Sequence, residues 1–162
     1  MPALSRFLRT FCLGLGLVLG ASSLAHAQMI PSGLPESDKQ LIKGYTLNED
    51  VFSRLAAATR EARAQGIPPQ AAPDPAKVHS LDDLAKEAMA GDPRIPALVS
   101  KHGFTPREFM LANIALSNAV MAVQSRRDVV LASDINQSWV NPDNVRFVDS
   151  HKDDVAALLQ GK

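Results

Sequence analysis

Apolar residues recur at helical spacing along much of the chain, and the longest such run lies at 106–126. No charged side chain occurs from Phe109 to Ser125. On a helical wheel the apolar residues of this run occupy two sides, and only a narrow stripe is polar. A helix that is apolar almost all round belongs in the middle of a packed domain. The pattern therefore predicts a central helix over about 106–126.

Capping signals place the beginnings of two helices. The segment 105–108 reads Thr-Pro-Arg-Glu, which combines a cap, a first-turn proline and a capping-box glutamate. The segment 46–49, Thr-Leu-Asn-Glu, fits the same box, so a helix is predicted to begin at Thr46 or Asn48. Gly66, followed by Ile-Pro-Pro, is predicted to end it.

Weaker patterns predict further helices, and nothing in the sequence shows the sustained alternation of a strand. The predicted ranges are 37–44, 80–91, 92–103, a restart at 141–142 and a last helix over 150–160. The sequence leaves the structure of residues 129–141 open. We therefore expect an all-α fold, a small bundle of four to six helices around the central one.

The chain divides by composition into an N-terminal part and one domain. Residues 28–45 read as a leader with at most a short helix, and residues 46–162 as a single helical domain. The segment 67–77 contains four prolines. Because proline fixes φ and removes a donor, this segment is predicted to be an extended linker within the domain.

The first 27 residues have the three parts of a cleavable signal peptide. Arg6 and Arg9 supply positive charge, residues 11–20 are apolar, and Ala-His-Ala at 25–27 forms a small-residue cleavage site. Cleavage is predicted between Ala27 and Gln28. The alternative is an N-terminal membrane anchor, but the apolar run is shorter than the roughly 20 residues that a spanning helix needs. We expect an exported protein, periplasmic or secreted, with no stable membrane anchor after cleavage.

Cleavage would also change the composition of the chain. Cys12, the only cysteine, would be removed, which excludes disulfides, thiolate metal sites and cysteine nucleophiles from the mature protein. Loss of Arg6 and Arg9 would leave 15 basic against 17 acidic side chains, a net charge of about −2. A weakly acidic chain is a poor match for nucleic acid, which attracts basic surfaces.

No pattern of residues points to catalysis, a metal or a cofactor. His79, His102 and His151 are far apart in the sequence, whereas metal ligands on helices usually lie three or four residues apart. Most acidic residues fall at predicted helix starts, where they complement the helix dipole. We therefore expect no catalytic residue, no metal site and no cofactor.

Two features of the predicted central helix are candidates for binding. The first is an apolar contact face, which the N-terminal helices would alternatively cover; it comprises Met110, Ile114 and Met121. The second is a polar stripe that could line a pocket, or alternatively face solvent or bond a neighbouring helix; it comprises Asn113, Ser117 and Gln124.

Three functional hypotheses follow. The first is a non-enzymatic interaction or adaptor module, whose partner is another protein or a further copy of the chain. The second is a carrier of an apolar small molecule in a cavity between helices. The third is an enzyme whose site has no recognisable motif. An exposed apolar face would favour the first, a large cavity beside Asn113 the second, and a cleft joining a histidine to a carboxylate the third.

Overall fold

The computed structural model describes residues 33–69, 73–74, 76–126 and 139–161. In this part of the chain there are seven helices and no strand, so the predicted all-α class is confirmed with more helices than expected. The helices are α1 (Glu36–Gly44), α2 (Glu49–Ala64), α3 (Leu81–Ala90), α4 (Ile95–Lys101), α5 (Pro106–Ser125), α7 (Pro142–Ser150) and α8 (Lys152–Gln160). The predicted signal peptide, its cleavage site, residues 129–138 and part of the predicted linker lie outside the described residues.

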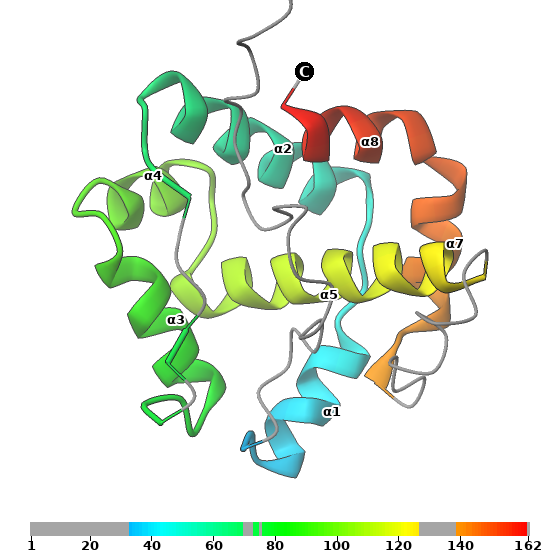
Figure 1. Ribbon diagram of the computed structural model, residues 1–162, viewed down its shortest axis with the longest axis horizontal. Helices are drawn as coiled ribbons and strands as arrows, with labels where there is room; N and C mark the ends of the chain where they lie inside the picture. The colour runs from blue at the N-terminus through cyan, green and yellow to red at the C-terminus, as the bar shows by residue number, and fades with distance from the viewer. Residues whose placement is uncertain (1–32, 70–72, 75, 127–138, 162) are drawn as a thin grey trace, which may run out of the picture.

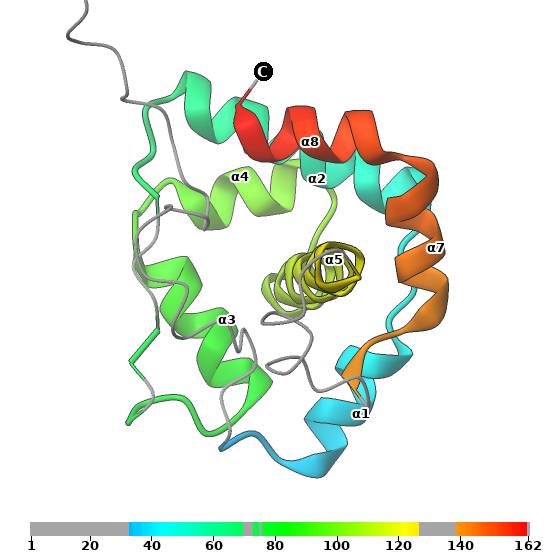
Figure 2. The ribbon, with the colours of Figure 1, turned by 45° about the vertical axis from the view of Figure 1, so that its right-hand side comes forward.

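Helix α5 lies at the centre of the fold, as its apolar pattern predicts. It packs against α1, α2, α3, α4 and α7. Figure 2 shows α5 close to end-on, with the other helices arranged around it. In Figure 1 it crosses the middle of the molecule, with α2 and α8 above it and α1 below. A helix in this position must be apolar on more than one side, because it has neighbours on more than one side.

The side chains that cap the helices explain where most of them begin. Thr105 Oγ1 accepts a hydrogen bond from the backbone N–H of Glu108 at 3.1 Å, as its sequence predicts. Ser80 caps α3 and Asn141 caps α7 in the same way. These side chains satisfy backbone donors that have no partner within their own helix.

The structure decides between the two predicted starts of α2 and corrects the predicted start of α4. Asn48, not Thr46, caps α2, and its side chain accepts from the N–H of Val51 at 2.9 Å. The backbone N–H of Leu47, the residue between them, donates to the side chain of Asn144 on α7 at 2.7 Å. Helix α4 begins at Ile95 rather than at 92–93, because residues 92–94 form a turn in which the Ile95 N–H donates to the Asp92 carbonyl at 3.0 Å.

Buried apolar side chains form two clusters, one on each side of α5. The larger contains residues of α2, α4, α5, α7 and α8 and includes Leu116, which is 5% exposed. Leu116, in the middle of the uncharged run of α5, is therefore a core residue. The smaller joins α1, α3 and α5 and consists of Leu34, Ile42, Val78, Leu81, Leu84 and Ile114.

Candidate contact site between α1 and α5

Of the predicted contact face of α5, Ile114 is covered in the folded chain, and the other two residues are partly exposed. Ile114 is only 2% exposed and belongs to the smaller cluster, and Met110 packs against that cluster from a half-buried position. Met121, further along the helix, is also half-buried. Helices α1 and α3 provide the cover, since Ile42 and Leu84 lie in the same cluster as Ile114. Ile114 is therefore a core residue and is not available to a partner.

The predicted polar stripe does not converge on the hollow that the structure has beside α5. Asn113 Nδ2 donates to the carbonyl of Phe109 in the same helix at 2.8 Å. Ser117 is half-buried and Gln124 is exposed. None of the three lines the hollow described next.

The surface between α1 and α5 has an open hollow of about 370 Å³. Its lining residues are Ser37, Gln40, Leu41, Gly44, Tyr45 and Leu111. Leu41 is 46% exposed and is the one large hydrophobic side chain among the described residues that is exposed rather than buried or half-buried. The sequence pattern did not predict this site, because residues 28–45 read as a leader with at most a short helix.

The spacing of residues along α1 produces one wall of the hollow. Gln40 and Leu41 each lie three or four positions from both Ser37 and Gly44, so the four residues share one side of the helix. Leu41 and Ile42 are adjacent, so they point in different directions, and Ile42 takes the core side. Gly44 has no side chain, and no neighbouring atom lies within 4 Å of the place that a Cβ would take, which leaves that end of the wall open.

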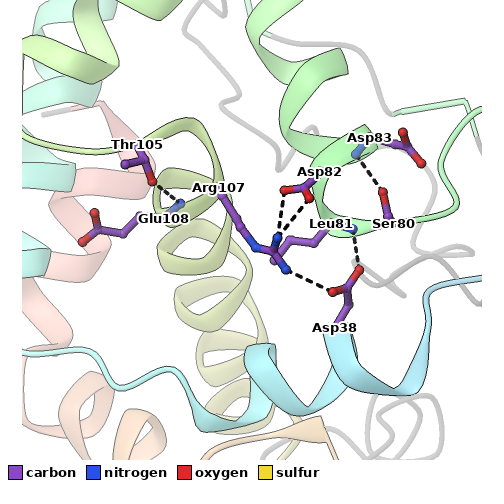
Figure 3. A network of polar contacts seen from close by, with 8 residues as sticks. All are labelled: Asp38, Ser80, Leu81, Asp82, Asp83, Thr105, Arg107 and Glu108. Carbon is purple, nitrogen blue, oxygen red and sulfur yellow. Dashed lines mark hydrogen bonds and ion pairs between the residues drawn. The ribbon is translucent and has the colours of Figure 1, made fainter.

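Asp38 fixes α1 against its two neighbours (Figure 3). Its Oδ2 accepts a hydrogen bond from the backbone N–H of Leu81 at 2.7 Å, at the start of α3. Its Oδ1 accepts from Arg107 of α5 at 3.2 Å, and Arg107 Nη1 also lies 3.0 Å from both carboxylate oxygens of Asp82. Asp38 is buried, and its partner Arg107 is half-buried. The carboxylate of Asp38 therefore joins α1 to both α3 and α5. The hollow is therefore bounded by helices held in a defined position.

Tyr45 lies at one end of the hollow, and its backbone carbonyl is hydrogen-bonded to two side chains near the start of α7. Its carbonyl accepts hydrogen bonds from Asn144 at 2.8 Å and from Asn141 at 3.2 Å. Its hydroxyl is buried with no hydrogen-bond partner among the described residues. Burial raises the pKa of the Tyr45 phenol, and the nearby Glu108 carboxylate raises it further. Tyr45 is therefore a neutral phenol in the folded chain.

The histidines with carboxylate partners lie away from the hollow, and each is paired with one glutamate. His102 Nε2 lies 2.9 Å from Glu61, and Lys101 bonds the other oxygen of the same carboxylate at 2.7 Å. Lys101 and His102 together hold the pKa of Glu61 below its usual range. His151 is paired with Glu49 at the other end of α2.

The described residues contain no group of three histidine, cysteine or acidic side chains placed to hold a metal ion. Within those residues, too, no helix has the length and apolar character needed to cross a membrane. Around the hollow the lining is apolar apart from Ser37, Gln40 and the neutral Tyr45. Such a lining can bind an apolar group and orient it by hydrogen bonds.

These features define an all-α domain built around α5, with an apolar hollow beside its N-terminal half. Comparison with protein-family models, with curated proteins and with solved structures gave no match. Function is therefore inferred from the site and the sequence.

Proposed function

We propose that the protein is an exported, non-enzymatic interaction module that binds a protein partner at the hollow between α1 and α5. The observation that carries this proposal is the exposure of Leu41 beside an apolar hollow. Leucine side chains in solvent are ordinary when scattered, but one that borders an apolar depression with hydrogen-bonding groups is typical of a contact site. The position of Leu111 on the opposite wall extends the apolar surface across two helices.

The shape of the hollow favours a protein partner over a carried small molecule. Carrier sites bury most of their ligand's surface, whereas this hollow is open to solvent along the side of α1. An open apolar depression of this kind suits one or two side chains that protrude from a partner. Ser37 and Gln40 supply hydroxyl and amide groups at its edge, where a partner backbone could be bonded.

A photo-crosslinking experiment tests the contact site. A photoreactive amino acid is placed at Leu41 in cells that produce the protein, with Ala97 as the matched control, since Ala97 is exposed on α4 and does not line the hollow. We expect a discrete crosslinked species from position 41 only. Leu111→Lys should abolish it, because a charge in the opposite wall would oppose apolar docking. The same species from both positions, or none from position 41, would refute the site.

Export is tested separately from binding. The positive, apolar and small-residue parts of residues 1–27 support it. N-terminal sequencing of the protein recovered outside the cytoplasm is expected to begin at Gln28. Recovery of an intact chain beginning at Met1 in the membrane fraction would contradict cleavage. It would not bear on binding, which the crosslinking experiment tests.

A further inference from the structure

His151 occupies the corner between two helices, and both of its ring nitrogens lie against oxygen atoms. It is the only residue between α7 and α8. Its Nε2 lies 2.5 Å from Oε1 of Glu49, and its Nδ1 lies 2.8 Å from the carbonyl oxygen of Phe147. The imidazole also stacks on the Phe147 ring, with 4.2 Å between the ring centroids. The ring is thus held on three sides.

This arrangement suits a charged imidazolium better than a neutral imidazole. The imidazolium donates from both nitrogens, whereas a neutral ring carries one N–H and presents a lone pair at the other nitrogen. In either neutral tautomer a lone pair would face the Glu49 carboxylate or the Phe147 carbonyl. The Ser150 hydroxyl, 3.0 Å from Nδ1, can donate to one tautomer and so offsets part of that loss. Deprotonation therefore weakens the corner without removing every contact.

The contact with Glu49 joins parts of the chain that are distant in sequence. Glu49 is the first residue of α2, and the two residues are 102 positions apart. Figure 1 shows α8 lying alongside α2. Further along α8, Arg63 of α2 donates to the Leu158 carbonyl at 2.6 Å, and the side chain of Leu158 is in the main core. The histidine thus secures one end of α8 while other contacts secure the rest.

The charged groups that face His151 are acidic. Glu49 faces it from α2 and Asp154 from α8, while α7 contributes the Phe147 carbonyl and the Ser150 hydroxyl. The hydrogen bond to the Phe147 carbonyl raises the pKa of His151, partial burial lowers it, and Glu49 and Asp154 raise it, so that the pKa stands above its usual value.

We propose that His151 is a protonation-dependent latch that holds the α7–α8 corner on the N-terminus of α2 and loosens as the pH rises. The sign follows from linkage. A histidine whose pKa is higher in the folded chain than in the unfolded chain stabilises the fold fully below the unfolded value of about 6.5. That stabilisation disappears as the pH rises through the folded pKa. Deprotonation therefore weakens the contacts of His151, and these lie at the N-terminal end of α8.

Amide hydrogen exchange measures such a local loosening directly. Exchange of the Val155 N–H, which donates to the His151 carbonyl at 2.9 Å, is compared with exchange in α5 between about pH 5.5 and about pH 8.5, a window that brackets histidine titration. After correction for intrinsic base catalysis, we expect opening at Val155 to rise several-fold relative to α5. His151→Gln should flatten this dependence, and Glu49→Gln should reduce it. His79→Gln, at an exposed histidine, is the matched control and should leave it unchanged.

The ring titration gives a second readout that does not depend on the His151 variant folding. In the NMR spectrum, His151 is expected to titrate at higher pH in the folded chain than in the urea-unfolded chain, and Glu49→Gln should lower the midpoint of His151 in the folded chain. If His151 titrates at the same pH in the folded and unfolded chains, or if Val155 opening follows α5 at every pH, the latch is refuted. A pH dependence that survives in His151→Gln would also overturn it.

Discussion

The side chain of Asn144 reaches back 97 positions along the chain, where its Oδ1 accepts a hydrogen bond from the backbone N–H of Leu47 at 2.7 Å. Its Nδ2 donates to the carbonyl of Tyr45 at 2.8 Å. Asn144 is only 1% exposed, so its amide and the N–H of Leu47 bonded to it are shielded from water. One amide on α7 thus satisfies the backbone of the connection between α1 and α2, which is the connection that positions one end of the hollow.

Asn144→Ala is expected to lower the free energy of unfolding by about 2–4 kcal/mol, because it leaves the buried N–H of Leu47 without its acceptor and removes one of the two donors to the Tyr45 carbonyl. Asn113→Ala is the control, since Asn113 is half-buried and bonds only within its own helix; its cost should be within about 0.5 kcal/mol. Urea unfolding measures both. Equal losses of stability in the two variants would mean that the long-range hydrogen bonds of Asn144 contribute no more than the local hydrogen bond of Asn113.

The two aspartates bonded to Arg107 should differ strongly in their contribution to stability. Asp38→Ala removes the acceptor for the buried N–H of Leu81 and is expected to cost about 2–4 kcal/mol. Asp82→Ala, at a side chain that is 69% exposed, is expected to cost about 1 kcal/mol or less, as surface ion pairs and first-turn acids do. Chemical denaturation of both variants makes the comparison. A larger loss for Asp82→Ala would show that α1 is not held through Asp38.

Asp92 provides a test at acid pH. Hydrogen bonds from the Arg94 side chain and backbone hold the pKa of Asp92 down to about 2. The Arg94 guanidinium also donates to the Gln65 carbonyl at 2.7 Å, so this turn joins the end of α2 to the start of α4. A carboxylate whose pKa is lowered by folding stabilises the fold above its unfolded pKa, near 4, and that stabilisation disappears as the pH falls toward 2.

The difference in stability between the original chain and Asp92→Asn should therefore be constant above about pH 4 and shrink between about pH 4 and about pH 2. Urea unfolding followed by circular dichroism at several pH values in this window is the measurement. A difference that stays constant down to about pH 2 would show that Asp92 titrates alike in the folded and unfolded chains.

Local signals made most of the helix positions predictable. The caps at Thr105, Ser80 and Asn141 act within three residues, so their sequences alone identify them. The uncharged run of α5 is likewise a local property, and it correctly predicts a central helix. The local capping pattern left the start of α2 at Thr46 or Asn48, and the structure has Asn48 as the cap, while the N–H of Leu47 is bonded to a residue 97 positions away.

The candidate site could not be predicted in the same way. Helical spacing shows that α5 is apolar on two sides, but only the docking of α1 decides which side is covered. That docking depends on Asp38 meeting Leu81, which is 43 residues away, and Arg107, which is 69 away. A weak signal for the site does exist, since Leu41 and Ile42 are adjacent and a helix can bury only one of them fully against a single neighbour.

Ile114 and Leu41 give the sharpest test of which apolar surface is covered and which is free. Ile114→Ala removes a side chain from the closed cluster between α1, α3 and α5 and is expected to cost about 2–5 kcal/mol. Leu41→Ala removes a side chain of similar size from the surface and should change stability by no more than about 0.5 kcal/mol. Thermal and urea unfolding measure both variants. If the two costs were equal and small, α1 would not cover α5, and the face of Met110, Ile114 and Met121 would again be open to a partner. If they differ as expected, Leu41 can be replaced without disturbing the fold, so a crosslink formed by a photoreactive residue at position 41 reports on binding to the folded chain.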